Sequence, residues 1–242
     1  MSDHDPRSEQ FVEHFETTHW SLVLDAGEPD AAALDACTAR ANDLMALSRE
    51  RIADELLKLL GLPNPARTVR IMLERAILSP VLPEVAVERL GDLQSLIAAE
   101  AEARVAPDAL RRLAALLPRD PDVAENVAAR LRLSNKARRR LACAAVRLPE
   151  LTSQALAYRV GVDCAADRLL LAGRSADAAQ LEGWRAPRLP IGGGALIARG
   201  LAEGPIVART LRTIEDRWVE AGFPRGDEFE TIVADALAAA KA

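Results

Sequence analysis

The stretch SRERIADELLKLL, residues 48–60, has the pattern of an amphipathic α-helix. Its apolar residues recur at helical spacing and form one stripe, which consists of Ile52, Leu56, Leu59 and Leu60. The opposite side carries Arg51, Glu55 and Lys58. Ser48 is a helix-capping residue type and Gly61 is a residue type that ends helices, so we predict one helix between them.

The same pattern continues through most of the chain from Ala31 onward. Hydrophobic residues make up 50% of the sequence but aromatic residues only 3%, which favours closely packed helices over a sheet. Pro, Gly or Ser-Asn separates the periodic segments. We therefore predict an all-α fold, an array of short helices joined by short loops. The expected helices include residues 83–104, 107–117, 121–133, 134–148, 175–183, 193–199, 205–221 and 226–241.

Charge, cysteines and hydropathy limit the class of protein. The formal net charge is −5, so a site for a polyanion must be a local patch. Cys37, Cys143 and Cys164 lie far apart without C-x-x-C spacing, which predicts small apolar thiols and neither a disulfide nor a zinc site. The sequence has no apolar stretch near the length of a membrane span and no signal-peptide pattern, so we expect a cytoplasmic chain without a membrane partner.

The glycine-rich stretch IGGGALIARGLAEGPIVARTLR, residues 191–212, raises the question of a phosphate site. It lacks the Gly-Lys-Ser/Thr ending of a P-loop and the preceding strand and third glycine of a dinucleotide fingerprint. Two interpretations stay open. The favoured one is a helical hairpin whose glycines cap helices, with Gly200 as a left-handed cap. The other is contact between backbone amides and a phosphate, with Arg199, Arg209 and Arg212 nearby.

No catalytic constellation is visible in the sequence. Asp120-Pro121-Asp122 has the spacing of a metal-binding carboxylate pair, but it begins a predicted helix, where acidic residues are favoured. The histidines, His4, His14 and His19, are spaced too loosely for a zinc site. We predict neither a catalytic residue nor a metal ligand in this chain.

A basic surface is predicted within SNKARRRLACAAVRL, residues 134–148. On an ideal helix, Lys136, Arg140 and Arg147 lie within roughly 40° of one another. Arg138 and Arg139 widen this surface. It would suit contact with nucleic-acid phosphates, and it would equally suit a solvated arginine face; composition leaves both interpretations open.

Four stretches together resemble the C-terminal part of the bacterial class II CCA-adding tRNA nucleotidyltransferase and poly(A) polymerase family. They are SRERIADELLKLL (48–60), RIMLERAILSPVLPE (70–84), RLRLSNKARRRL (130–141) and the segment from Leu189 to Pro224. GEPDAAALDAC (27–37) is similar to the spacer that precedes the first stretch. The resemblance covers about residues 27–224.

The resemblance implies which part of such an enzyme this chain represents. The family's catalytic head carries G-G-x-V-R-D, D-x-D and R-R-D motifs and its neck an E-D-x-x-R motif, and the chain has none of them. Mg and CTP or ATP would belong to that head, so no cofactor is expected here. EQFVEHFETTHWSLVL departs from the arginine- and phenylalanine-rich helix of the family, which suggests a truncated or re-started reading frame, or a fusion.

The resemblance also assigns domains. It implies an atypical, partly disordered segment at 1–26, the end of the neck and start of the body at 27–105, body at 106–188 and tail at 189–242. The residues expected at the head–neck junction are Ser48, Arg49, Arg51, Glu55 and Lys58. The residues expected to contact RNA are Lys136, Arg138, Arg139, Arg140, Arg147, Arg199, Arg209 and Arg212.

Two functions follow from this resemblance. The first is a helical portion that holds tRNA, or another structured RNA, by its shape and backbone, without catalysis of its own. The alternative is a helical interaction module or split-enzyme subunit that docks a nucleotidyltransferase head in cis or in trans. The few aromatic residues predict no stacking platform for single-stranded bases. Whether a parent enzyme adds CCA or poly(A) is left open.

Overall fold

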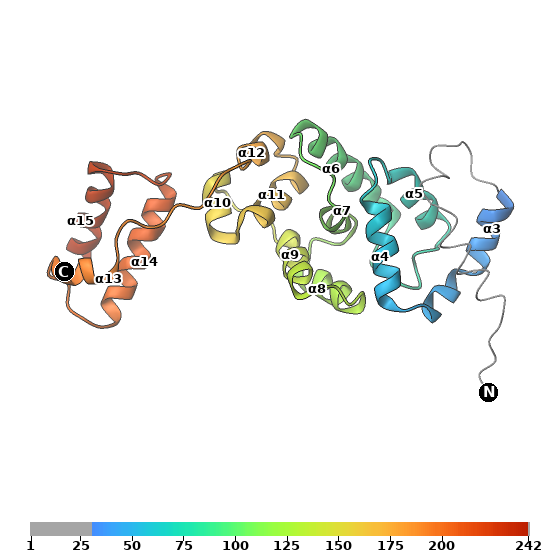
Figure 1. Cartoon of the computed structure of the whole chain (residues 1–242), viewed down its shortest axis with the longest axis horizontal. Coiled ribbons are helices and arrows are strands. Elements are labelled where there is room, and N and C mark those ends of the chain that lie inside the picture. Colours follow the sequence, from blue (N-terminus) through green and yellow to red (C-terminus); the bar gives the residue numbers. More distant parts are fainter. Residues whose placement is uncertain (1–30, 242) are drawn as a thin grey trace. The chain divides into compact units, whose positions relative to one another are not determined.

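A computed structural model describes residues 31–241, and all the regular secondary structure in this range is helical (Figure 1). The all-α prediction is therefore confirmed. The elements are α3 (Ala31–Ala39), η1 (Ala41–Ala46), α4 (Arg49–Leu60), α5 (Ala66–Glu74), η2 (Val87–Arg89), α6 (Leu90–Glu102), α7 (Ala109–Leu116), α8 (Pro121–Arg130), α9 (Asn135–Ala145), α10 (Ser153–Val160), α11 (Val162–Leu171), α12 (Ser175–Ala179), α13 (Gly193–Ala198), α14 (Pro205–Glu220) and α15 (Asp227–Lys241). None of the helices in this range is long and apolar enough to cross a membrane.

The chain divides into two compact units. Of the described residues, the first unit contains 31–148 and 167–175, and the second contains 149–166 and 176–241. The expectation for residues 1–26 lies outside the described residues. The other expected domain limits, at 105 and 188, do not coincide with these boundaries and stay predictions.

Helix α4 forms as its sequence predicts. The Ser48 hydroxyl accepts a hydrogen bond from the Arg51 backbone N–H at 3.3 Å, which satisfies one of the unpaired donors at the helix start. Ile52 and Leu56 are buried and Leu60 is fully buried, so the apolar stripe faces the core of the first unit. The helix ends at Leu60, immediately before Gly61.

Three helices of the first unit end in a left-handed residue that is not glycine. Ala76, Arg104 and Arg132 have φ between 52° and 55° and follow α5, α6 and α8 at equal intervals along the chain. After each of them, the next backbone N–H donates to a carbonyl five residues earlier, as from Val105 to Glu100 at 2.9 Å. These turns are Schellman motifs, in which glycine is the usual residue.

Several helix boundaries differ from their predictions, and two of the differences have a local explanation. A single helix is expected to start at Pro83. Instead, the short helix η2 starts at Val87 and α6 starts at Leu90, because Ala86 is extended and Val85 is buried. The helix expected to reach residue 148 ends at Ala145. Pro149 disfavours helical geometry at the residue before it, and Val146 already has extended dihedral angles.

The second unit is built around α10, α13, α14 and α15. Its buried core includes Leu196 of α13, Ile214 and Trp218 of α14, and Phe229 and Val233 of α15. The expected helical hairpin at the glycine-rich stretch is present as α13 and α14. These helices pack because each presents an apolar stripe to its neighbours.

The prediction about cysteines holds for one residue and fails for two. Cys37 is a free thiol, and partial burial raises its pKa. Cys143 and Cys164 are disulfide-bonded, so the expectation that the spacing excludes a disulfide is wrong. Sequence separation alone does not decide whether two cysteines meet in a fold.

Candidate nucleic-acid interface

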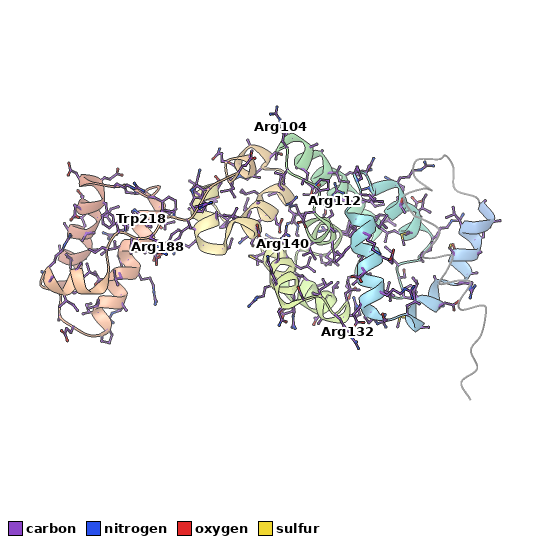
Figure 2. The ribbon with its side chains drawn as sticks, in the orientation of Figure 1. Arg104, Arg112, Arg132, Arg140, Arg188 and Trp218 are labelled. Carbon is purple, nitrogen blue, oxygen red and sulfur yellow. The ribbon has the colours of Figure 1, made fainter. Side chains whose placement is uncertain are left out.

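The basic residues of the described chain fall into two groups. Some arginines are used inside the protein, where they pair with carboxylates or with backbone carbonyls. Others are exposed without a partner among residues 31–241. Figure 2 shows the paired Arg112 and Arg140 among the packed helices, and Arg104, which has no partner among residues 31–241, at a helix end. Only the exposed basic residues without a partner can bind a polyanion, so these residues define the candidate interface.

A buried ion-pair network lies at the centre of the first unit. Arg111 and Arg112 of α7 both pair with Glu100 of α6, at 2.8 and 2.9 Å, and Arg111 Nε also pairs with Asp167 of α11 at 2.8 Å. The four residues are at most 5% exposed. Two arginines here balance two carboxylates, as buried charges require. The network connects helices and does not face solvent.

Arg140 of α9 belongs to the same network. Its Nε lies 2.6 Å from Asp167 Oδ2, and its Nη1 lies 2.8 Å from Asp108 Oδ2. Hydrogen bonding to Asp167 raises the pKa of Arg140 above its already high normal value. The pKa of Asp108 is lowered: burial alone would raise it, but the Arg111 backbone N–H and the charge of Arg140 outweigh burial. Arg140 therefore has a structural role here, and we leave it out of the candidate interface.

Arginines also donate to backbone carbonyls at, or just beyond, the C-terminal ends of helices. These ends carry carbonyls without intrahelical partners and a partial negative charge, which guanidinium groups satisfy. Arg112 donates to the Leu60 carbonyl at 2.8 Å, at the end of α4. The corresponding donors are Arg89 to the Leu117 carbonyl at 2.6 Å, Arg119 to the Leu171 carbonyl at 2.6 Å, and Arg168 to the Arg147 carbonyl.

On α9, two of the predicted RNA-binding residues are available. Lys136 and Arg139 are exposed, three residues apart, and have no partner among the described residues. Arg138 lies on another side of the helix and pairs with Glu125 of α8. Arg147 is exposed but lies beyond the end of α9. The expected common helical face of Lys136, Arg140 and Arg147 is therefore wrong, because the helix ends before Arg147.

In the second unit, α14 presents two of the predicted basic residues. Arg209 and Arg212 are exposed and without a partner among the described residues, whereas Ile214 of the same helix is buried. Arg199 pairs with Glu230 of α15 at 2.8 Å, and its carbonyl accepts from Lys241 Nζ at 3.0 Å. Arg209 and Arg212 are thus the stronger candidates for contact with RNA.

Structural requirements explain why glycine occurs at two positions of this hairpin. Gly200 has φ of 86°, so its prediction as a left-handed cap is confirmed. A Cβ on Gly193 would lie 3.0 Å from Val207 Cγ1, so a larger residue would require Val207 of α14 to shift by a few tenths of an ångström. Close helix packing and capping account for these two glycines without a phosphate.

The residues expected at a head–neck junction all lie on or next to α4. Ser48 caps the helix, Arg49 contacts Met45 Sδ at 3.6 Å, and Glu55 pairs with Lys58 at 2.6 Å. Arg51 is partly exposed on the same helix. A small apolar pocket beside α4 has a volume of about 30 Å³, room for little more than one water molecule. Docking of a head at this helix stays a prediction.

Asp120 has the helix-starting role that its position predicts. Its side chain accepts hydrogen bonds from the backbone N–H groups of Asp122 at 2.8 Å and Val123 at 3.3 Å. Within residues 31–241, no group of three or more His, Cys, Asp or Glu residues is arranged to hold a metal ion. The carboxylates of this turn therefore cap α8.

Sequence reasoning missed a set of exposed arginines in the second unit. They have no partner among the described residues and consist of Arg185, Arg188, Arg217 and Arg225. A signal was present, because residues 183–202 contain three arginines and no acidic residue. Such a stretch has no carboxylate of its own to compete with a bound anion for its arginines.

Comparison with known proteins gives one family match. Residues 28–88 match a family described as the probable RNA and SrmB-binding site of polymerase A. The matched segment is about a quarter of the chain and runs from α3 to η2 in the first unit. No curated protein matches the sequence. The family match supports a relationship between this segment and the poly(A) polymerase and CCA-adding family.

Proposed function

We propose that this chain is an RNA-holding helical portion of the poly(A) polymerase and CCA-adding family, with tRNA as its RNA. The observation that carries the proposal is the match of residues 28–88 to an RNA-binding family segment. The all-helical fold of residues 31–241 agrees with a holding role. Nucleotide transfer would then belong to a separate head.

The physical basis of the proposal is contact with the RNA backbone. A-form RNA hides its base edges in a deep, narrow groove, so helices that contact phosphates and 2′-hydroxyls are suited to hold it. The exposed cations of each unit supply such contacts: Lys136, Arg139 and Arg147 in the first, and Arg209 and Arg212 in the second. A local set of this kind binds phosphates in a chain whose formal net charge is −5.

Binding of labelled tRNA, followed by fluorescence anisotropy at low salt, tests this proposal. Lys136→Glu and Arg139→Glu should each weaken binding about tenfold, since each replaces a phosphate contact by repulsion. Arg104→Glu is the matched control, because Arg104 is also exposed and unpaired within residues 31–241 but lies outside the proposed contacts. It should leave the affinity within about twofold of the unmodified chain.

Competition with other nucleic acids tests the finer part of the proposal. A tRNA should compete better than a DNA duplex of equal charge, because DNA lacks the 2′-hydroxyls and the A-form shape. Absence of tRNA binding at low salt would contradict the proposal as a whole. Equal competition by the DNA duplex would contradict recognition of RNA and leave only attraction between charges.

A further inference from the structure

All aromatic residues between residues 31 and 241 lie in the second unit, and their rings contact one another. The Phe223 ring is central: its centroid lies 5.0 Å from that of Trp218, 5.5 Å from that of Tyr158 and 6.0 Å from that of Trp184. Phe229 completes the cluster against Trp218. Within residues 31–241, the few aromatic rings are therefore gathered in one cluster.

Two tryptophans of this cluster have different environments. Trp218 is 2% exposed, and its indole N–H donates to the Pro224 carbonyl at 2.9 Å. Trp184 is partly exposed, contacts a single ring, and makes no hydrogen bond to the described residues. Its indole N–H is not a buried unsatisfied group. Trp184 therefore lies at the edge of the cluster, where its ring is available to a further partner.

The segment that follows Trp184 carries paired positive charges. Residues 185–190 read R-A-P-R-L-P and have no regular secondary structure. Only Ala186 and Pro187 separate Arg185 from Arg188, so both guanidinium groups belong to one short segment. Leu189 packs against the core of the unit, which holds the segment in place. Figure 2 labels Arg188, which directly precedes Leu189 on this segment.

These arginines are exposed and have no ion-pair partner among the described residues. Acidic neighbours in the chain are Glu182 before the segment and Glu203 after α13, both exposed, and none lies between them. A partly exposed indole followed in the chain by two exposed arginines without a partner among residues 31–241 supplies the two contacts that bind single-stranded nucleic acid: the base stacks on the ring and the cations bind the backbone. Trp and Arg are also enriched in protein interfaces, but the match of residues 28–88 to an RNA-binding family segment favours RNA as the partner.

We propose that Trp184, Arg185 and Arg188 bind an unpaired nucleotide of the RNA, with its base stacked on the indole and adjacent phosphates on the two arginines. This inference rests on the proposed RNA-holding function and deepens it. The proposed function involves only the backbone of structured RNA, and this inference adds contact with one unpaired nucleotide. It also reverses the expectation from composition that the chain lacks a stacking platform.

The test compares a single-stranded oligouridylate with a blunt A-form RNA duplex, each bound to the full chain at low salt. Trp184→Ala should weaken binding of the oligouridylate about tenfold and leave duplex binding within about twofold, since stacking requires an exposed base. Trp184→Phe should retain most of the affinity, because it keeps an aromatic face. Tryptophan emission should fall when the oligouridylate binds, and Trp184→Phe should lose most of this quenching.

Ile197→Ala is the matched control, because Ile197 is an exposed hydrophobic residue of the same unit. It should change neither affinity. If the unmodified chain binds no RNA at all, the proposed function fails and this inference fails with it. If the chain binds the duplex but not the oligouridylate, or if Trp184→Ala binds the oligouridylate normally, the inference alone is wrong. Equal weakening of both RNAs together with a lower unfolding temperature would make Trp184 structural and would also overturn it.

Discussion

Tyr158 shows how one side chain can report on the core of the second unit. Its hydroxyl donates to Glu215 Oε1 at 2.5 Å, and its ring packs edge-on against Trp218. Burial, and then the hydrogen bond to Glu215, raise the pKa of Tyr158 to about 12. Because the neutral phenol is the favoured form, its contribution to stability is present below pH 10 and is lost as the pH rises through the raised pKa.

The sequence contains a single tyrosine, so its ultraviolet titration reports on Tyr158 alone. We expect the absorbance change of phenol ionisation to have its midpoint near pH 12. Glu215→Gln should move the midpoint toward the normal value near pH 10, since it removes the negative charge that opposes ionisation. A midpoint near pH 10 in the unmodified folded chain would contradict the hydrogen bond.

Arg104 has a backbone conformation that its side chain disfavours. Its φ is 55°, and Cβ contacts in the left-handed region cost roughly 1–2 kcal/mol for residues other than glycine. Arg104→Gly should therefore stabilise the first unit by about 1 kcal/mol, despite the entropy cost of glycine. Urea unfolding measures this change.

Ala101→Gly is the control for that substitution, because Ala101 is exposed within α6 itself. It should destabilise the chain by about 1 kcal/mol, the usual cost of glycine inside a helix. The same sign of change for both variants would show that the turn at Arg104 is not left-handed. Local sequence predicted the helix starts at Ser48 and Asp120. It did not predict the left-handed turn at Arg104, because only glycine in the sequence signals a left-handed residue.

At the scale of helices, the buried network explains why the first unit is specific in its packing. Arg112 bonds Glu100 of α6 and the carbonyl of Leu60 at the end of α4, so one side chain connects three helices. Removing one partner of such a pair leaves the other charge buried and unpaired. The penalty is larger than for an exposed pair, where solvent replaces the lost partner.

Arg112→Met should therefore lower the free energy of unfolding by about 3–5 kcal/mol. Arg138→Ala breaks the exposed pair with Glu125 and should cost at most about 1 kcal/mol. Chemical denaturation of the two variants gives the comparison. Similar small losses for both would mean that the Arg112 guanidinium is hydrated in solution.

Helix positions were predictable from sequence, but the roles of most arginines were not. The periodic stripe of 48–60 and the proline and glycine boundaries are local signals, and α4, α13, α14 and α15 form where these signals place them. The partners of Arg140, in contrast, are Asp108 and Asp167, which are distant in sequence and come close only when the helices pack. A basic face drawn on an isolated helix cannot show which of its charges are already paired.

At the scale of the whole chain, many arginine side chains pair with carboxylates or backbone carbonyls and so stabilise the fold. A smaller set, exposed and without a partner among residues 31–241, remains for binding. This explains how the family match can fall on residues 28–88 while the unpaired cations of the candidate interface lie on α9 and α14. Within 28–88, Lys58 and Arg75 pair with carboxylates. In the proposed function, the matched segment supplies the family scaffold and the exposed cations supply the phosphate contacts.

The salt dependence of tRNA binding tests the central claim most directly. The logarithm of the association constant should fall linearly with the logarithm of salt concentration, with a slope set by the number of phosphates contacted. Lys136→Gln with Arg139→Gln should reduce the magnitude of that slope by about 2, one for each lost phosphate contact. A flat salt response of the unmodified chain, or an unchanged slope in the double variant, would contradict RNA holding through these residues.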